Sequence, residues 1–201
     1  VEPAPYRAAR LVSDSICQLD YAGVFGEMAT ANDIYLDLAG SQVKAYRPEL
    51  FKVLRSAAGV SEEAWDSCMN TNNLESLSAD SKSGQAFWRS VDGILVLKTI
   101  KQYECKNLRA ILEQLAHHVT AQPSAICGVL GLFRVKLASG KRVYLLACKS
   151  AYHHEDQDVT HSIRYDLKGS TVGRSKSPTS TVYKDVDLIK SRQLFQLGPD
   201  R

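Results

Sequence analysis

The side chains best placed to do chemistry in the middle of the chain are Lys98 and Glu104. Lys98 ends an apolar run, residues 93–97, that is typical of a strand, and strand alternation puts it on the same face as Val96. An ammonium group among buried positions needs an anionic partner or loses its charge. Glu104 follows six residues later, in the first turn of the next helix and on the side that faces the sheet. The two side chains are therefore predicted to form an ion pair between strand and helix.

A strand lysine oriented by a helix glutamate is the arrangement that kinases use to hold the α- and β-phosphates of ATP. The segment 81–84, Ser-Lys-Ser-Gly, precedes the strands of this region, and a small flexible loop there could offer backbone N–H groups to phosphates. The alternative is a lysine that reaches solvent, a surface glutamate and an ordinary turn, and the spacing alone leaves both open. The chain has no Walker A motif, which argues against a P-loop nucleotidase.

A second candidate phosphate site is the segment 166–174, Asp-Leu-Lys-Gly-Ser-Thr-Val-Gly-Arg. Lys168 and Arg174 supply positive charge there, and the glycines let a ligand approach the backbone closely. Composition alone describes a basic surface turn, so this interpretation needs support from elsewhere in the chain.

The composition is that of a soluble globular protein. The chain has 201 residues, of which 44% are hydrophobic and 23% charged, and no apolar run approaches the roughly 18 residues of a membrane-spanning helix. The cysteines are odd in number and lack C-x-x-C spacing, which disfavours a disulfide framework or a zinc site and fits a reducing compartment.

The charge changes sign along the chain. Residues 1–80 hold 6 Lys or Arg against 12 Asp or Glu, whereas residues 81–201 hold 19 against 10. A basic second part suggests an anionic partner, such as phosphate groups, an acidic membrane or nucleic acid, although an ordinary solvated surface would look the same. We expect no nucleic-acid partner, because the stacking aromatics and RNP pattern of RNA-binding sheets are missing.

The order of elements predicts an α+β fold. A hairpin, a helix, a second hairpin and a short strand are expected, and an antiparallel sheet with helices on one face is their natural packing. The helix should bury a stripe of Leu108, Ile111, Leu112 and Leu115, while Pro48 and Ser61 should begin two shorter helices. The expected bounds are 85–90 and 94–99 for the first hairpin, 104–119 for the helix, 132–137 and 143–148 for the second hairpin, and 164–167 for the last strand. Residues 70–84 have loop composition, and residues 1–40 are expected to be less ordered or to pack as an appendage.

Six motifs together resemble the phosphatidylinositol phosphate kinase family, in its phosphatidylinositol-4-phosphate 5-kinase-like form. Asp166–Ser170 is similar to the family's D-L-K-G-S signature. The others occur in family order between residues 43 and 188: the opening helix from Tyr46 to Gly59, S-G-Q-A-F at 83–87, L-K-T-I at 97–100 with Glu104, L-G-L-F-R-V at 130–135 and Y-K-D-V-D at 183–187. The resemblance divides the chain into an N-terminal extension, residues 1–42, and the N-terminal part of the kinase domain, residues 43–201. It implies the fold of that family's N-terminal lobe.

The resemblance also implies an activity. This is ATP-dependent phosphorylation of the inositol ring of a phosphatidylinositol phosphate, of the 4-phosphate 5-kinase type, with ATP and Mg²⁺ as cofactors. The ATP-binding residues would be Ser83, Gly84, Lys98 and Glu104, and Lys168 and Arg174 would lie near the lipid substrate or the membrane. Ser150 stands where the family has a hinge asparagine, which leaves the adenine contacts unassigned.

The family's catalytic M-D-Y-S-L-L segment and its metal-binding I-I-D segment follow the Y-K-D-V-D motif, and neither occurs before Arg201. We therefore expect a fragment that is inactive alone, with no catalytic base and no metal ligand assigned. The alternative is a non-catalytic lobe that binds nucleotide or membrane without turnover. The implied partners are a phosphoinositide lipid, an anionic membrane surface and a second copy in a homodimer. The implied location is cytoplasmic, peripheral on the cytosolic face of membranes.

Overall fold

The protein is described by a computed structural model that covers residues 2–18, 33–38, 40–77, 85–151, 163–178 and 180–192. The chain divides into two compact units, residues 1–153 and residues 154–201. None of the described helices is long and apolar enough to cross a membrane.

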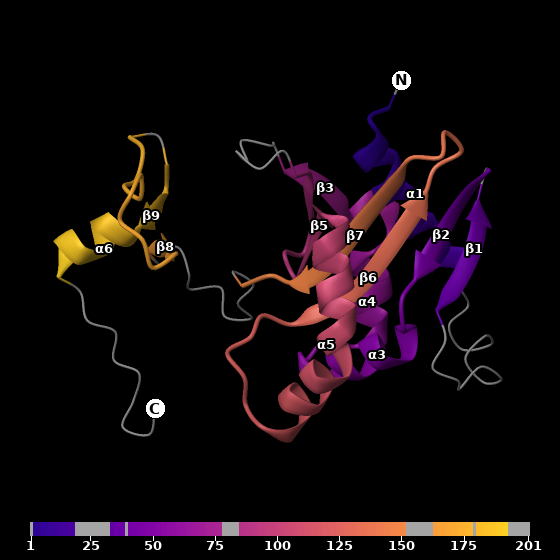
Figure 1. The fold of residues 1–201 in the computed structure, drawn as a ribbon, viewed down its shortest axis with the longest axis horizontal. Coiled ribbons are helices and arrows are strands. Elements are labelled where there is room, and N and C mark those ends of the chain that lie inside the picture. Colours follow the sequence, from indigo (N-terminus) through magenta and orange to yellow (C-terminus); the bar gives the residue numbers. More distant parts are fainter. Residues whose placement is uncertain are drawn as a thin grey trace. The chain divides into compact units, whose positions relative to one another are not determined.

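The first unit is built on a seven-stranded antiparallel sheet (Figure 1). The strand order is β1-β2-β6-β7-β5-β4-β3, so the N-terminal strand β2 pairs with β6 from the middle of the chain. The α+β fold class and both predicted hairpins are confirmed. The bounds are β1 Ile34–Leu38, β2 Ser41–Ala45, β3 Leu74–Leu77, β4 Phe87–Ser90, β5 Leu95–Ile100, β6 Val129–Lys136 and β7 Arg142–Lys149.

The hairpins form because their turns contain residues that accept the required backbone geometry. Between β4 and β5, Gly93 adopts a φ of 77°, and the Asp92 carboxylate accepts the N–H of Ile94 at 3.0 Å. Between β6 and β7, Gly140 adopts a φ of 82°, and its N–H donates to the carbonyl of Leu137 at 2.8 Å. Glycine takes a positive φ without the strain that a side chain would cause. These turns set the strand register on which the candidate site depends.

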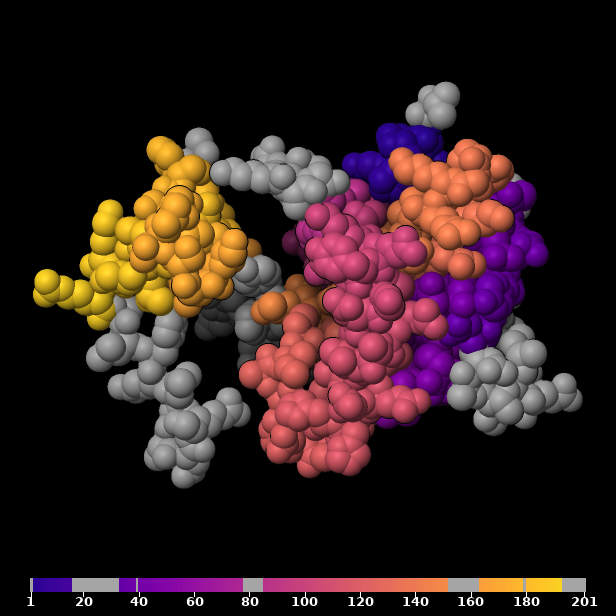
Figure 2. Space-filling view, viewed as in Figure 1, coloured from indigo at the N-terminus to yellow at the C-terminus, as the bar shows by residue number. Residues whose placement is uncertain are grey.

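Helices cover both faces of this sheet, and the prediction of helices on one face is wrong. α1 Ala4–Gln18 and α4 Glu62–Cys68 share one core cluster, which includes Val12, Trp65 and Leu97. α3 Pro48–Ala57 and α5 Gln102–Ala121 belong to a second cluster, which includes Phe51, Leu112 and Leu132. In the space-filling view, α5 spreads across the face turned to the viewer (Figure 2). Both faces need cover because the central strands carry apolar side chains on each side.

The predicted helix starts are confirmed. Pro48 is the first residue of α3, where its missing N–H breaks no helical hydrogen bond. The hydroxyl of Ser61 accepts the N–H of Ala64 at 3.1 Å and caps α4, and the short 3-10 helix Thr71–Asn73 follows. Along α5, Leu112 is buried as predicted, but Ile111 is 50% exposed.

The described N-terminal residues, 2–18 and 33–38, pack into the first unit and are not an appendage. Val12 of α1 is fully buried, and every residue of β1 pairs with β2. The expected boundary between residues 42 and 43 therefore falls inside β2. Residues 74–77, predicted as loop, form β3 at the sheet edge beside β4. These segments are placed by tertiary contacts, since α1 packs on the core and β2 pairs with the distant β6.

Arg55 joins α3 to α4 and to β6. Its side chain is 3% exposed and donates two hydrogen bonds of 2.7 Å to the carboxylate of Glu62. It donates a third, of 3.0 Å, to the carbonyl of Leu130. The guanidinium lies over the ring of Trp65, 4.6 Å from the ring centroid. The buried cation is satisfied by these contacts.

In the described part of the second unit, residues 163–178 and 180–192, a short parallel strand pair is followed by one helix. β8 Arg164–Asp166, close to the predicted 164–167, pairs with β9 Val182–Lys184. α6 Asp185–Ser191 follows β9 directly. Tyr165 and Tyr183 are cross-strand partners, with ring centroids 5.5 Å apart. The chain from β8 to β9 is held by polar contacts to α6, which are the core of the second candidate site.

Candidate functional site

Lys98 lies on β5, directly opposite Phe87 of β4 and Leu146 of β7. Alternation sends Leu95 and Leu97 into the first core cluster and leaves Lys98 on the opposite face, where α5 packs. Its side chain is half-buried. Among the described residues, no carboxylate lies within ion-pair distance, 4.0 Å, of its ammonium group.

Glu104 does not pair with Lys98, and the predicted ion pair is wrong in this structure. Its carboxylate turns back and accepts the N–H of Lys101 at 2.6 Å, which caps the first turn of α5. The open N–H groups at a helix start attract a nearby carboxylate, and this local bond is the one that forms. Residue Cys105, not Glu104, is the buried one in this turn.

The other residues expected around ATP are only partly described. Ser83 and Gly84 lie outside the described residues. Ser150, at the hinge position, is 8% exposed, and its N–H donates to the carbonyl of Ile94 at 2.7 Å. The β7 end is therefore tied to the start of β5, the strand that carries Lys98.

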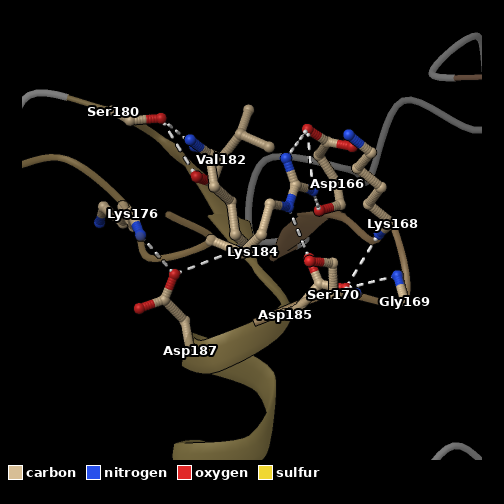
Figure 3. A network of polar contacts seen from close by, with 11 residues as sticks. Asp166, Lys168, Gly169, Ser170, Lys176, Ser180, Val182, Lys184, Asp185 and Asp187 are labelled. Carbon is tan, nitrogen blue, oxygen red and sulfur yellow. Dashed lines mark hydrogen bonds and ion pairs between the residues drawn. The ribbon is translucent and has the colours of Figure 1, made fainter. Parts of the chain in front are cut away.

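Asp185 organises the second candidate site (Figure 3). One carboxylate oxygen accepts the N–H groups of Lys168 at 2.9 Å, Gly169 at 2.7 Å and Ser170 at 3.3 Å. The other accepts from Nε of Arg174 at 2.8 Å. The bond from Arg174, with those from the backbone, holds the pKa of the Asp185 carboxyl well below its ordinary value against the effect of burial.

Arg174 links β8 to α6 within this network. Its side chain is 15% exposed and pairs with the carboxylates of Asp185 and Asp166, at 2.8 and 3.2 Å. It also donates to the backbone carbonyl of Asp166. The guanidinium is thus surrounded by acceptors from its own chain, and it spans from β8 to α6.

Asp187, two residues later, binds backbone N–H groups with its carboxylate as Asp185 does. Its carboxylate accepts the N–H of Lys176 at 2.6 Å and that of Lys184 at 3.0 Å, which caps α6 (Figure 3). The ammonium of Lys176 lies over the ring of Tyr183, 4.2 Å from its centroid. Asp185 and Asp187 together hold the segment 168–176 against the start of α6.

Lys168 and Arg174, the two basic residues predicted to lie near the substrate or membrane, differ in exposure and in charged partners. Arg174 is enclosed by carboxylates, whereas Lys168 is exposed, and no ion pair to it is found among residues 163–178 and 180–192. Only the backbone of Lys168 joins the network. The sequence left Asp185 and Asp187 without a role, and their presence in the Y-K-D-V-D motif was the one signal available. Spacing did not show that Asp185 would reach back 15 to 17 residues and Asp187 11 residues.

Comparison with known proteins shows which protein family this chain is similar to. A model described as phosphatidylinositol-4-phosphate 5-kinase matches residues 68–201. A probable phosphatidylinositol phosphate kinase of Dictyostelium discoideum is 34% identical over 170 residues, which cover 79% of this chain and 23% of that protein. Phosphatidylinositol 4-phosphate 5-kinase 9 of Arabidopsis thaliana is 33% identical over 153 residues, 72% of this chain and 18% of that protein.

A third relative has a different ring position in its name. Phosphatidylinositol 5-phosphate 4-kinase type-2 alpha of Mus musculus is 27% identical over 161 residues, 77% of this chain and 38% of that protein. The chain thus spans between 18% and 38% of the length of these three relatives.

Proposed function

Because the chain belongs to the phosphatidylinositol-4-phosphate 5-kinase family, we propose that it forms the nucleotide-binding lobe of a phosphatidylinositol phosphate kinase. The whole protein would transfer the γ-phosphoryl group of ATP to a hydroxyl of the inositol ring. The relatives are named for both 5-kinase and 4-kinase reactions, and we propose the 5-kinase type on the family description and the first relatives.

The observation that carries this proposal is Lys98. A half-buried lysine on a central strand, with no carboxylate partner within reach among the described residues, supports binding of an external anion. Its neighbours on the same face, Phe87 and Leu146, are apolar and would limit the access of water to a bound phosphate. To orient Lys98, Glu104 would need to leave the cap that it forms on α5.

Mg²⁺ would bind to this protein as a complex with ATP. Among the described residues, no three His, Cys, Asp or Glu side chains are grouped so that they could hold a metal ion, so we assign no protein ligand to it. Asp166, Asp185 and Asp187 are each bonded to backbone or guanidinium groups and are not offered as the catalytic base. Since the family's M-D-Y-S-L-L and I-I-D segments do not occur in these 201 residues, we expect this chain to bind nucleotide without turnover.

Nucleotide binding tests the proposal directly. The anisotropy of a fluorescent ATP analogue should rise when the chain is added with Mg²⁺, and unlabelled ATP should reverse it. Lys98→Met should weaken binding by tenfold or more, since a hydrogen bond to a charged group contributes about 1.5–3 kcal/mol. Lys136→Met is the matched control, because Lys136 is an exposed lysine on β6 of the same sheet. Equal affinities of the two variants would refute the assignment of Lys98.

We further propose that Lys168 contacts anionic lipid on the cytosolic face of membranes. Its ammonium group is exposed, while its backbone is held in place by Asp185. A lysine near an acidic leaflet contributes about 1 kcal/mol, and salt screens this attraction.

Vesicle co-sedimentation tests the lipid contact. Lys168→Glu should reduce binding to vesicles containing phosphatidylinositol 4-phosphate more than Lys106→Glu does, Lys106 being an exposed lysine of α5. Binding that ignores lipid charge, or that responds equally to both reversals, would refute the role of Lys168. Arg174→Glu is unsuitable here because it would break the network with Asp166 and Asp185.

A further inference from the structure

Cys127 and Cys148 bring two thiols together where β6 begins and β7 ends. Val129 of β6 is the cross-strand partner of Cys148, and Cys127 precedes it by two residues. The N–H of Lys149 donates to the carbonyl of Gly128 at 2.8 Å, which holds the two segments side by side. The Cys127 thiol donates to the carbonyl of Lys149, the residue that follows Cys148, at 3.0 Å. Both cysteines are free.

Positive charge surrounds this pair. Cys148 is opposite Val96 on β5, and the next pair on the same face is Lys98 with Leu146. The neighbouring Cys148 thiol, helped by the charges of Lys98 and Lys149, lowers the pKa of the Cys127 thiol against the effect of burial, and the same interaction raises the pKa of Cys148. The thiolate is the form of cysteine that reacts with oxidants.

The other described thiols are in a different environment. Cys68 is 1% exposed and Cys105 is 3% exposed. Burial raises the pKa of both, that of Cys68 to about 12. Cys127, by contrast, is exposed and lines a cavity of about 300 Å³ between the ends of α3 and α5 and the segment that leads into β6. A small oxidant can therefore reach its sulfur, whereas the buried thiols are shielded.

We propose that Cys127 and Cys148 form a peroxide-reactive dithiol, a modification site that hydrogen peroxide converts into an intramolecular disulfide. Cys127 precedes the regular ladder of β6, so its backbone can make the small shift that disulfide geometry requires. The disulfide would join the start of β6 to the end of β7 beside Lys98. The proposal rests on the thiols and their surroundings and does not depend on nucleotide binding.

The chemistry balances in two steps. The Cys127 thiolate attacks one oxygen of hydrogen peroxide; an S–O bond forms, the O–O bond breaks, and hydroxide leaves and is protonated to water. This gives the sulfenic acid of Cys127. The Cys148 sulfur then attacks that of Cys127; the S–S bond forms, the S–O bond breaks, and the hydroxyl leaves as water with the proton of Cys148. The two thiols lose two electrons in total, and peroxide is reduced to two waters.

Peptide mapping of the full 201-residue chain tests the proposal. The reduced chain is treated with hydrogen peroxide, alkylated in denaturant and digested with trypsin without reduction. Cleavage after Arg and Lys puts Cys127 in peptide 110–134 and Cys148 in peptide 143–149, so their disulfide gives a unique linked mass. We expect this linked pair as the main product, formed at least tenfold faster than any oxidation of Cys68 or Cys105.

Two variants separate the steps. Cys148→Ser should stop the reaction at the Cys127 sulfenic acid, which dimedone traps, and Cys127→Ser should leave Cys148 reduced at the same peroxide dose. In concentrated urea the selectivity for Cys127 should vanish, because the fold creates it. Equal rates at all thiols of the folded chain, or disulfides formed only between chains, would overturn the proposal. So would rapid oxidation of Cys148 in the Cys127→Ser variant.

Discussion

Replacing Arg55 by methionine should cost the first unit about 3 kcal/mol of unfolding free energy. The change keeps an apolar stem over Trp65 but removes the two bonds of 2.7 Å to Glu62 and the bond of 3.0 Å to the Leu130 carbonyl. Removing one partner of a buried ion pair costs about 3–5 kcal/mol. The lower end applies here, because the Glu62 side chain is 27% exposed and can recover water.

Urea unfolding followed by tryptophan fluorescence measures this loss. Both tryptophans, Trp65 and Trp88, lie in the first unit, so the signal excludes the second. The matched control is Arg47→Met. Arg47 is 29% exposed and pairs with Glu113, which is 76% exposed, and such surface pairs contribute about 0–1 kcal/mol. An Arg55→Met variant within 1 kcal/mol of the control, at equal m-values, would refute the reasoning, since roughly a hundredfold change in the folding equilibrium is expected.

The remaining predictions concern the second unit. Asp185→Asn removes the charge that Arg174 meets and should speed amide exchange at Gly169, whereas Asp187→Asn should speed exchange at Lys176 and leave Gly169 unchanged. Because the pKa of Asp185 is depressed in the folded state, its stabilising effect is complete above the ordinary carboxyl value and is lost as the pH falls below it. The Gly169 amide chemical shift should accordingly stay constant while ordinary carboxyls, with a pKa of about 3.9, titrate, and should move only on further acidification. A midpoint at or above that value would contradict the prediction.

The sequence predicted the elements that are specified by nearby residues. Asp92-Gly93 and Ser139-Gly140 encode hairpin turns, and Pro48 and Ser61 encode helix starts, because each acts on backbone groups only a few residues away. Lys98 was found in the same way, since alternation along one strand decides which face a residue occupies.

What only the tertiary structure decided depends on partners distant in the chain. The N-terminal hairpin of β1 and β2 joins the sheet through the pairing of β2 with β6, more than 80 residues further along the chain. The contacts of Arg174 could not be predicted, because composition counts its charge but cannot show that Asp166 and Asp185 enclose it. The sequence likewise offered Glu104 two candidate partners, and its carboxylate bonds the N–H of Lys101 at the start of its own helix, not Lys98. A sequence states which groups are present, but their competition for partners is resolved only when folding sets the distances between them.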